Sequence, residues 1–293
     1  MLALPLAAYV ITMTVDSLGW RRLLRSLGHA VPLPPLVGLR VSIEAIQLSL
    51  PWGSVISESL TPAFLRERFR VPLTEAIAAT AARKCLFGST QGVFLIVAAA
   101  AGGTLLAAVA QATHFPALRL AFLGVAAVLL VLTGSAMSML ASGAVASWIR
   151  ARLQSIRLSR LRGFLDRRHE AFGHFDARAA HLFRPKTLAA AAPFVFGVWL
   201  AETFETWLLL RVLGVPISFP QALAVEAGAS VLRILGVAVP AGLGVQEVGY
   251  VAFIAGTGIP DAASYGAAFA VVKRTKEALW TTIGYTLLLR WRS

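Results

Sequence analysis

The sequence is poor in charge and in cysteine. Only 14% of its 293 residues are charged and 57% are hydrophobic, whereas soluble domains carry about 25% charged residues. The mean hydropathy is correspondingly high, at +0.73. A lone cysteine, Cys85, lies in an apolar stretch. An intramolecular disulfide framework is therefore excluded, and we expect Cys85 to be a small buried apolar side chain.

The sequence contains five long apolar runs. They cover residues 1–20, 86–110, 117–142, 187–213 and 278–289. Because a membrane-spanning helix needs about 20 apolar residues, the sequence predicts an integral, multi-pass membrane protein. The first run has no basic leader and no clear small-residue cleavage site, so we expect a retained helix rather than a signal peptide.

Acidic residues are scarce beside basic ones, 14 against 27, which gives a net charge of +13. A basic balance can indicate nucleic-acid binding, but these basic residues concentrate in four regions between or after the apolar runs: 21–25, 66–70, the polar loop 148–186, and Arg290 with Arg292. The connections on the opposite side, residues 111–119, 214–220 and 256–264, contain only one Lys or Arg, which is Arg119. The positive-inside rule therefore predicts that these regions and the C-terminus face the cytoplasm, and the expected location is a bacterial inner membrane. The 148–186 loop is predicted to lie on the anionic inner leaflet, and no nucleic-acid partner is expected.

This topology makes the segment between the first two basic regions enter and leave the membrane on one side. Its apolar piece, residues 36–50, is short and is interrupted at Pro51 and Gly53. Residues 220–260 show the same pattern from the outer side, with breaks at Pro240, Gly242 and Gly244. Two opposed re-entrant helical hairpins are the simplest interpretation, and short tilted spans are the alternative.

The two breaks also align with each other in sequence. Residues 51–64 read PWGSVISESLTPAF and residues 240–253 read PAGLGVQEVGYVAF. Aligning them without a gap superposes Pro51 on Pro240, Gly53 on Gly242, and Glu58 on Glu247. In each case a basic pair follows inside the next apolar helix, Arg83-Lys84 and Lys273-Arg274.

Charge is scarce in this sequence, so the shared glutamate and basic pair indicate an internal repeat. The first copy would cover residues 1–110 and the second 187–293, with a connecting span and the basic loop over 111–186. The topology gives the two copies opposite orientations, an architecture that recurs in secondary transporters.

Charged residues inside the apolar segments are the candidate functional residues. An ionised group at the bilayer centre costs roughly 2.5–3.5 kcal/mol on insertion scales, so it tends to be paired or to line a wet cavity. We predict that a lipid headgroup binds five basic residues, namely Arg83, Lys84, Arg233, Lys273 and Arg274. The predicted charge-balancing or coupling residues are Glu58, Glu202, Glu205, Glu226 and Glu247. Asp16 and Glu44 could instead lie near an interface.

A purely structural interpretation stands beside this one and is compatible with it. In that interpretation, pairs between Glu58 or Glu247 and the basic residues only hold the hairpins in place. Enzyme chemistry is not indicated, because the sequence has no G-x-S-x-G or Walker-type run and no nucleophile–base set. Gly242 and Gly244 begin like a dinucleotide fingerprint, but Glu247 occupies the third glycine position. We therefore predict no cofactor.

Three histidines of the polar loop, His169, His174 and His181, were considered as metal ligands. They are five and seven residues apart and have no cysteine nearby. A solvated amphipathic helix on an anionic leaflet is the better interpretation, so no metal site is predicted.

Two segments resemble the lysylphosphatidylglycerol synthase transmembrane family. They are EAIQLSLPWGSVISESLTPAFLRERFRVPLTEAIAATAARK, residues 44–84, and PAGLGVQE, residues 240–247. That family contains the flippase half of the multiple peptide resistance factor and stand-alone relatives, including hopanoid-associated ones. The second segment carries the more specific motif, and the first departs from the family pattern where Trp52-Gly53-Ser54 and Ser57 replace a richer glycine pattern.

The resemblance implies lipid translocation. The full-length resistance factor also carries a cytosolic aminoacyltransferase domain, whereas this sequence ends after its last apolar helix, so aminoacyl transfer is not expected. The prediction is a single transmembrane domain, residues 1–293, that is all-α, with five full spans and two opposed re-entrant hairpins. It would move an anionic or isoprenoid lipid between leaflets. The alternative is a non-transporting anchor or scaffold subunit for a lipid-modifying or lipid-biosynthetic enzyme.

Overall fold

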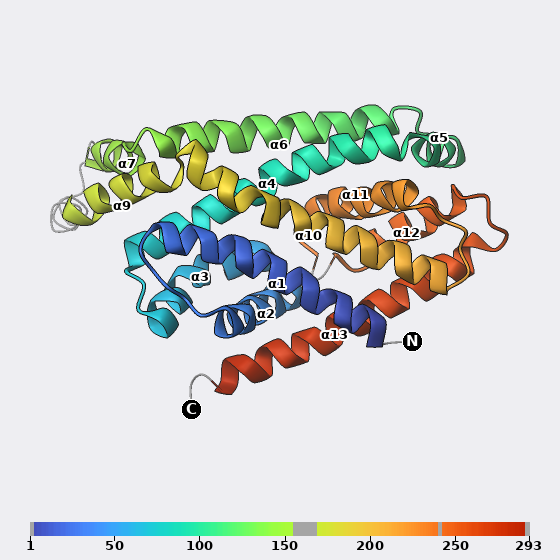
Figure 1. Cartoon of the computed structure of the whole chain (residues 1–293). Coiled ribbons are helices and arrows are strands. Elements are labelled where there is room, and N and C mark those ends of the chain that lie inside the picture. The colour runs from blue at the N-terminus through green and yellow to red at the C-terminus, as the bar shows by residue number, and fades with distance from the viewer. Residues whose placement is uncertain (1–2, 155–168, 240–241, 291–293) are drawn as a thin grey trace.

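The computed structural model describes residues 3–154, 169–239 and 242–290, and within these ranges its regular structure is helical (Figure 1). Twelve helices and no strand occur in the described ranges, which confirms the all-α prediction. The first six are α1 (Ala3–Ser26), α2 (Leu33–Ser49), α3 (Gly53–Phe69), α4 (Leu73–Ala101), α5 (Gly103–Ala112) and α6 (Leu118–Ala141). The others are α7 (Val145–Gln154), α9 (His169–Leu182), α10 (Pro185–Val212), α11 (Phe219–Leu235), α12 (Val245–Ala255) and α13 (Ala262–Arg290).

The α2–α3 break follows from the residues predicted to cause it. Leu50 is extended and Trp52 adopts a left-handed conformation with φ 56°. A Cβ atom on Gly53 would overlap the backbone carbonyl of Gln47, so the return of the chain there requires glycine. Two helices therefore replace one long helix and pack against each other.

The α11–α12 break has the same construction. α11 ends at Leu235, and α12 begins after Gly244, which has φ 83°. Gly242 is also in the left-handed region, with φ 61°. Pro240, the other residue predicted to cause this break, lies outside the described residues.

By length and composition, three described helices could cross a membrane: α4, α6 and α10. α1 and α13 have 24 and 29 residues, which is long enough to span, but their charged residues lower their hydropathy. The apolar run 86–110 is divided between α4 and α5 at Gly102. A Cβ atom on Gly102 would lie 2.6 Å from the Ala224 Cβ, so α11 crosses closely at this point.

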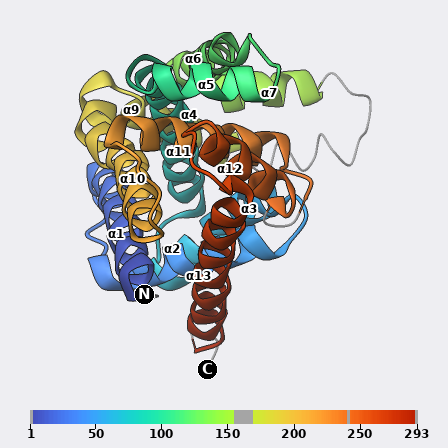
Figure 2. The same cartoon turned by 90° about the vertical axis from the view of Figure 1, so that its right-hand side faces the viewer.

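Three helix pairs join the first half of the chain to the second: α1 with α10, α2 with α13, and α4 with α11. α1 lies along α10 in the opposite direction, because Gly19 approaches Val195 whereas Gly197 approaches Val15 (Figures 1 and 2). α2 packs against α13, where the Ser42 hydroxyl donates a hydrogen bond to the Gly284 carbonyl over 3.0 Å. α4 packs against α11, while α3 rests on α4 and α12 rests on α13.

α6 lies on the outside of this arrangement (Figure 1). It packs on α4, where the Ser89 hydroxyl donates a hydrogen bond to Thr133 Oγ1 over 2.8 Å. Phe122 and Ala126 are its buried residues, and half of its other apolar side chains are exposed. An apolar helix with one exposed face fits contact with lipid tails.

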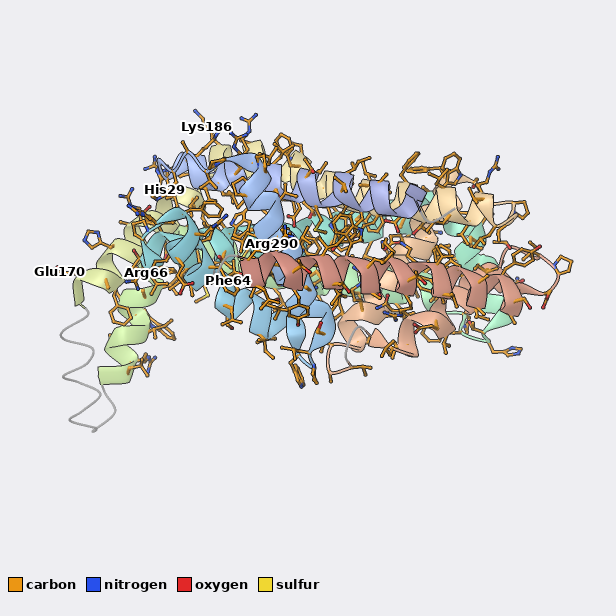
Figure 3. All side chains as sticks on the ribbon, turned by 90° about the horizontal axis from the view of Figure 1, so that it is seen from below. His29, Phe64, Arg66, Glu170, Lys186 and Arg290 are labelled. Carbon is orange, nitrogen blue, oxygen red and sulfur yellow. The ribbon has the colours of Figure 1, made fainter. Side chains whose placement is uncertain are left out.

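Polar and basic residues gather at one end of the molecule. Figure 3 shows His29, Arg66, Glu170 and Lys186 at this end. Glu75 on α4 holds α9 there through an ion pair of 2.9 Å with Arg178.

Candidate functional site

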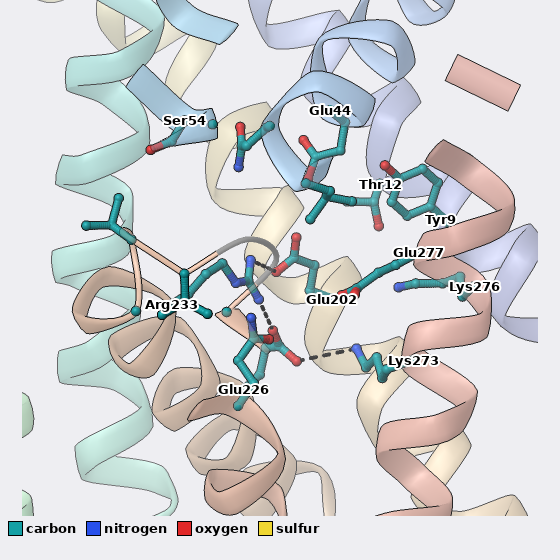
Figure 4. A pocket seen from close by; sticks show the side chains of 18 of the residues that line it. Tyr9, Thr12, Glu44, Ser54, Glu202, Glu226, Arg233, Lys273, Lys276 and Glu277 are labelled. Carbon is teal, nitrogen blue, oxygen red and sulfur yellow. Dashed lines mark hydrogen bonds and ion pairs between the residues drawn. The ribbon is translucent and has the colours of Figure 1, made fainter. Parts of the chain in front are cut away.

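A cavity of about 100 Å³ lies between the two broken helical pairs (Figure 4). Ser54 lines it from the start of α3, and Val239 and Gly242 line it from the connection between α11 and α12. α1, α10 and α13 supply further wall residues. Its charged lining residues are Glu44, Glu202, Glu205, Glu226, Arg233, Lys273, Lys276 and Glu277.

The centre of the cavity wall is an ion-paired cluster that joins α10, α11 and α13. Glu205 on α10 binds Lys276 at 2.6 Å and Lys273 at 3.3 Å, both from α13. Glu226 on α11 lies 3.7 Å from the same Lys273. The Thr206 hydroxyl donates a 2.6 Å hydrogen bond to Glu226, which is only 1% exposed. These contacts fix the three helices to one another inside the apolar body.

Arg233 extends this cluster to Glu202, and Arg274 on α13 binds two further carboxylates. Arg233 lies 3.3 Å from Glu226 and 3.7 Å from Glu202 (Figure 4). Arg274 binds Glu247 and Glu277, each at 2.6 Å. Glu247 is thereby held against α13, as the alignment of the two hairpins predicts.

A second ion-paired cluster joins α1, α2, α3 and α4. Asp16 binds Arg40 and Arg83, each at 2.5 Å. Arg40 continues to Glu44 at 2.7 Å. Glu58 lies 3.4 Å from Arg83 and 3.5 Å from Lys84. Of this cluster only Glu44 lines the cavity.

The predicted headgroup-binding residues therefore fall into two places. Arg233 and Lys273 line the cavity, and Arg274 is the neighbour of Lys273. Arg83 and Lys84 lie in the second cluster, on α4. All five are ion-paired with a carboxylate in the structure.

Sequence reasoning missed Arg40 and gave Asp16 little weight. Asp16 is only 1% exposed and joins three helices through its two arginines. One feature of the sequence could have identified Asp16. The spacing from Asp16 to Glu205 equals the spacing from Glu58 to Glu247. Arg40 could have been found from its i,i+4 relation to Glu44.

Tyr9 lines the cavity where α1 contacts α13. Tyr9 on α1 and Trp280 on α13 have ring centroids 4.8 Å apart, and the Lys276 ammonium lies 5.2 Å from the Tyr9 ring centroid. Tyr9 is 7% exposed, and its hydroxyl has no hydrogen-bond partner in the described part of the chain.

The histidines considered as metal ligands lie away from this cavity. His181 Nε2 lies 3.0 Å from the Ser26 carbonyl oxygen, which connects α9 to the end of α1. Within the described ranges, no group of three or more His, Cys, Asp or Glu residues could hold a metal ion.

Comparison with known proteins places this arrangement in a family. No curated protein and no solved structure matches the chain. The family described as the lysylphosphatidylglycerol synthase TM region matches residues 1–280, which is nearly the whole chain and includes both broken helical pairs. The chain belongs to the lysylphosphatidylglycerol synthase transmembrane family, whose membrane domain indicates a lipid-related function.

Proposed function

We propose that the protein moves an anionic or isoprenoid lipid between the leaflets of a bacterial inner membrane. The observation that carries this proposal is the charged cavity between the two broken helical pairs. Buried charges within an apolar helical body are costly and are retained mainly along substrate or ion pathways. A scaffold subunit needs no such cavity.

The two halves of the chain form an inverted repeat in this proposal. The packing of α1 on α10, of α2 on α13 and of α4 on α11 supports it, because each contact joins one half to the other. α2–α3 and α11–α12 would be re-entrant hairpins, and α1 and α13 would join α4, α6 and α10 as spans. The cavity would then lie near the bilayer midplane, where such transporters bind their substrates.

Arg233 is the cation best placed to meet a lipid headgroup. Its side chain is 39% exposed and its carboxylate contacts are 3.3 and 3.7 Å long, whereas the side chains of Lys273 and Lys276, which also line the cavity, are 8% and 9% exposed. An anionic headgroup would replace a carboxylate as its partner, and the released glutamates would balance charge. This activity makes and breaks no covalent bond, so the proposed protein is not an enzyme.

The basic end of the molecule gives the proposed orientation. This end, with the C-terminus, would face the cytoplasm and its anionic leaflet. Trp148 on α7 is 55% exposed, and the Arg152 guanidinium lies 5.6 Å from its ring centroid. Such an amphipathic pair suits a lipid–water interface.

Reconstitution in liposomes tests the proposal. Labelled lipids with anionic, zwitterionic and isoprenyl phosphate headgroups are incorporated separately, and a membrane-impermeant reagent then measures how fast each label changes leaflet. Wild-type protein is expected to accelerate an anionic or isoprenyl lipid. Arg233→Gln is expected to slow it, whereas Arg211→Gln, at the exposed end of α10, serves as the matched control. If wild-type protein moves no lipid faster than empty liposomes do, the proposal is wrong and the scaffold alternative is favoured.

A further inference from the structure

The two ion-paired clusters differ in charge balance. In the cluster of α1 to α4, three carboxylates meet three cations. The carboxylates are Asp16, Glu44 and Glu58, and the cations are Arg40, Arg83 and Lys84. This cluster is neutral when all of its groups are ionised.

The cluster of α10 to α13 is not neutral. Its carboxylates are Glu202, Glu205, Glu226, Glu247 and Glu277, and its cations are Arg233, Lys273, Arg274 and Lys276. In total five carboxylates face four cations: Glu202, Glu205 and Glu226 pair with Arg233, Lys273 and Lys276, while Glu247 and Glu277 both pair with Arg274. A buried charge without compensation is strongly unfavourable, so one carboxylate of this cluster needs a further positive partner.

Glu202 is the carboxylate with the weakest compensation. Its only ion pair in the described ranges is the 3.7 Å contact to Arg233, and that arginine approaches Glu226 more closely, at 3.3 Å. The Glu202 Oε2 atom has no hydrogen-bond partner among the described residues. The side chain is 21% exposed, toward the cavity, so water can reach it.

Tyr9 gives a second, independent indication of a polar binding site at this place. It is more than nine-tenths buried and lines the same cavity as Glu202, and its hydroxyl is also without a hydrogen-bond partner among the described residues. Buried polar atoms are nearly always hydrogen-bonded to protein or water. An orphaned hydroxyl and an orphaned carboxylate oxygen in one cavity therefore indicate a site for water and an exchangeable proton.

The other titratable groups of the cavity set the electrostatic environment of Glu202. The cations are Arg233 on α11 with Lys273 and Lys276 on α13. The carboxylates are Glu44 on α2, Glu205 on α10 itself, Glu226 on α11 and Glu277 on α13. The tyrosines are Tyr9 on α1 and Tyr250 on α12. α4 and α9 also pack on α10, but neither contributes a residue to the cavity lining.

We propose that Glu202 is a proton-binding site that exchanges its proton through the cavity between the two broken helical pairs. Protonation of Glu202 brings the summed charge of the α10–α13 groups to zero, and Arg233 then has Glu226 as its charged partner. Loss of the proton restores a second carboxylate that competes for Arg233. Because Arg233 is also the proposed headgroup contact, this site would couple lipid movement to proton movement, and that coupling rests on the proposed function.

Infrared difference spectroscopy of the purified protein in lipid nanodiscs tests the site directly. Spectra are compared between about pH 5 and pH 9, above the pH of about 4 at which ordinary carboxyl groups lose their proton. A protonated carboxylic acid gives a carbonyl stretching band that a carboxylate lacks. Wild-type protein is expected to show such a band with a pH-dependent amplitude, and Glu202→Gln is expected to lose it. Glu277→Gln, which removes a carboxylate from the same cavity, is expected to keep it.

A second variant covers the case in which Glu202→Gln does not fold. Among the described residues, Arg233 is the only cation paired with Glu202, so in Arg233→Gln the band is expected to persist to higher pH than in the wild type. The proposal is overturned if the wild type shows no such band, if the band survives in Glu202→Gln, or if Arg233→Gln leaves its pH dependence unchanged. This measurement needs no lipid movement, so failure of the transport assay would leave its result intact.

Discussion

Asp16 and Glu205 are held in the same way by residues far apart in the sequence. Arg83 on α4 binds Asp16 on α1 at 2.5 Å, and Lys273 on α13 binds Glu205 on α10 at 3.3 Å. In both halves a carboxylate of the first helix thus meets a basic residue of the helix that follows the hairpin. Each pair fixes the ends of its own half around the broken helices between them.

Asp16 is expected to be essential for stability. Asp16→Asn leaves Arg40 and Arg83 buried with one negative partner fewer, and breaking such a pair costs roughly 3–5 kcal/mol when it is dry. We expect a large fall in the melting temperature measured in detergent. Glu58→Gln is the matched control, because Arg83 keeps Asp16 and the Lys84 side chain is 53% exposed. Equal melting temperatures for the two variants would contradict this assignment.

The close crossing of α2 and α13 is expected to tolerate no side chain at Gly284. A Cβ atom there would lie 2.7 Å from both the Ala45 Cβ and the Val41 carbonyl oxygen. Gly284→Val is therefore expected to destabilise the protein by about 1–3 kcal/mol, the usual cost of overpacking. Gly134→Val on α6 is the control, because nothing lies within 4 Å of that position. Thermal unfolding of the two variants measures the difference, and a destabilisation confined to Gly134→Val would refute the packing argument.

Opposite ends of the molecule are expected to be reached from opposite sides of the membrane. In a Cys85→Ala background, Glu67→Cys at the end of α3 is expected to react with an impermeant thiol reagent only from the cytoplasmic side. Gln111→Cys at the end of α5 is expected to react only from the outside. Both positions are exposed in the structure. Labelling of both from one side would show that the charge-based topology is wrong.

The basic loop is expected to anchor the protein rather than to move lipid. Its segment 155–168 lies outside the described residues. Replacing Arg157, Arg160 and Arg162 with glutamine is expected to weaken contact with anionic lipid by about 1 kcal/mol per charge. Lipid movement per correctly inserted molecule is expected to stay near the wild-type value. Loss of lipid movement with normal insertion would place the loop in the transport site instead.

Helix breaks and charge pairs differ in how far the sequence specifies them. Pro51 and Gly53 predict the α2–α3 break because each has a local steric effect that holds in any surroundings. The pairing of Glu58 with Arg83 and Lys84 was expected from a repeated pattern. The 2.5 Å contact between Arg40 and Asp16 was not expected, because it depends on how α1 and α2 approach each other in space.

The lining of the cavity also depends on how the helices approach one another in space, so the sequence specified it only in part. Charged residues inside the apolar segments indicated a wet cavity, but the identity of its lining residues depends on how each helix is rotated about its axis. Lys273 and Glu277 share a face by spacing, yet Lys273 binds Glu205 and Glu226 while Glu277 binds Arg274. Lys273 thus pairs with residues of other helices, whereas Glu277 pairs with a residue of its own helix. Spacing along one helix therefore identified the charged face but not its partners.

α6 does not line the cavity, but it determines the direction in which α10, the first helix of the second half, runs relative to α1. The chain runs along the length of the molecule in α1, returns in α4, and reverses again in α6 before α10 begins (Figure 1). If α6 were removed, α10 would have to start at the opposite end and would run parallel to α1. The antiparallel contact of Gly19 with Val195 and of Gly197 with Val15 would then be impossible. The relative orientation of the two halves thus depends on whether the chain makes an odd or an even number of passes along the molecule before α10.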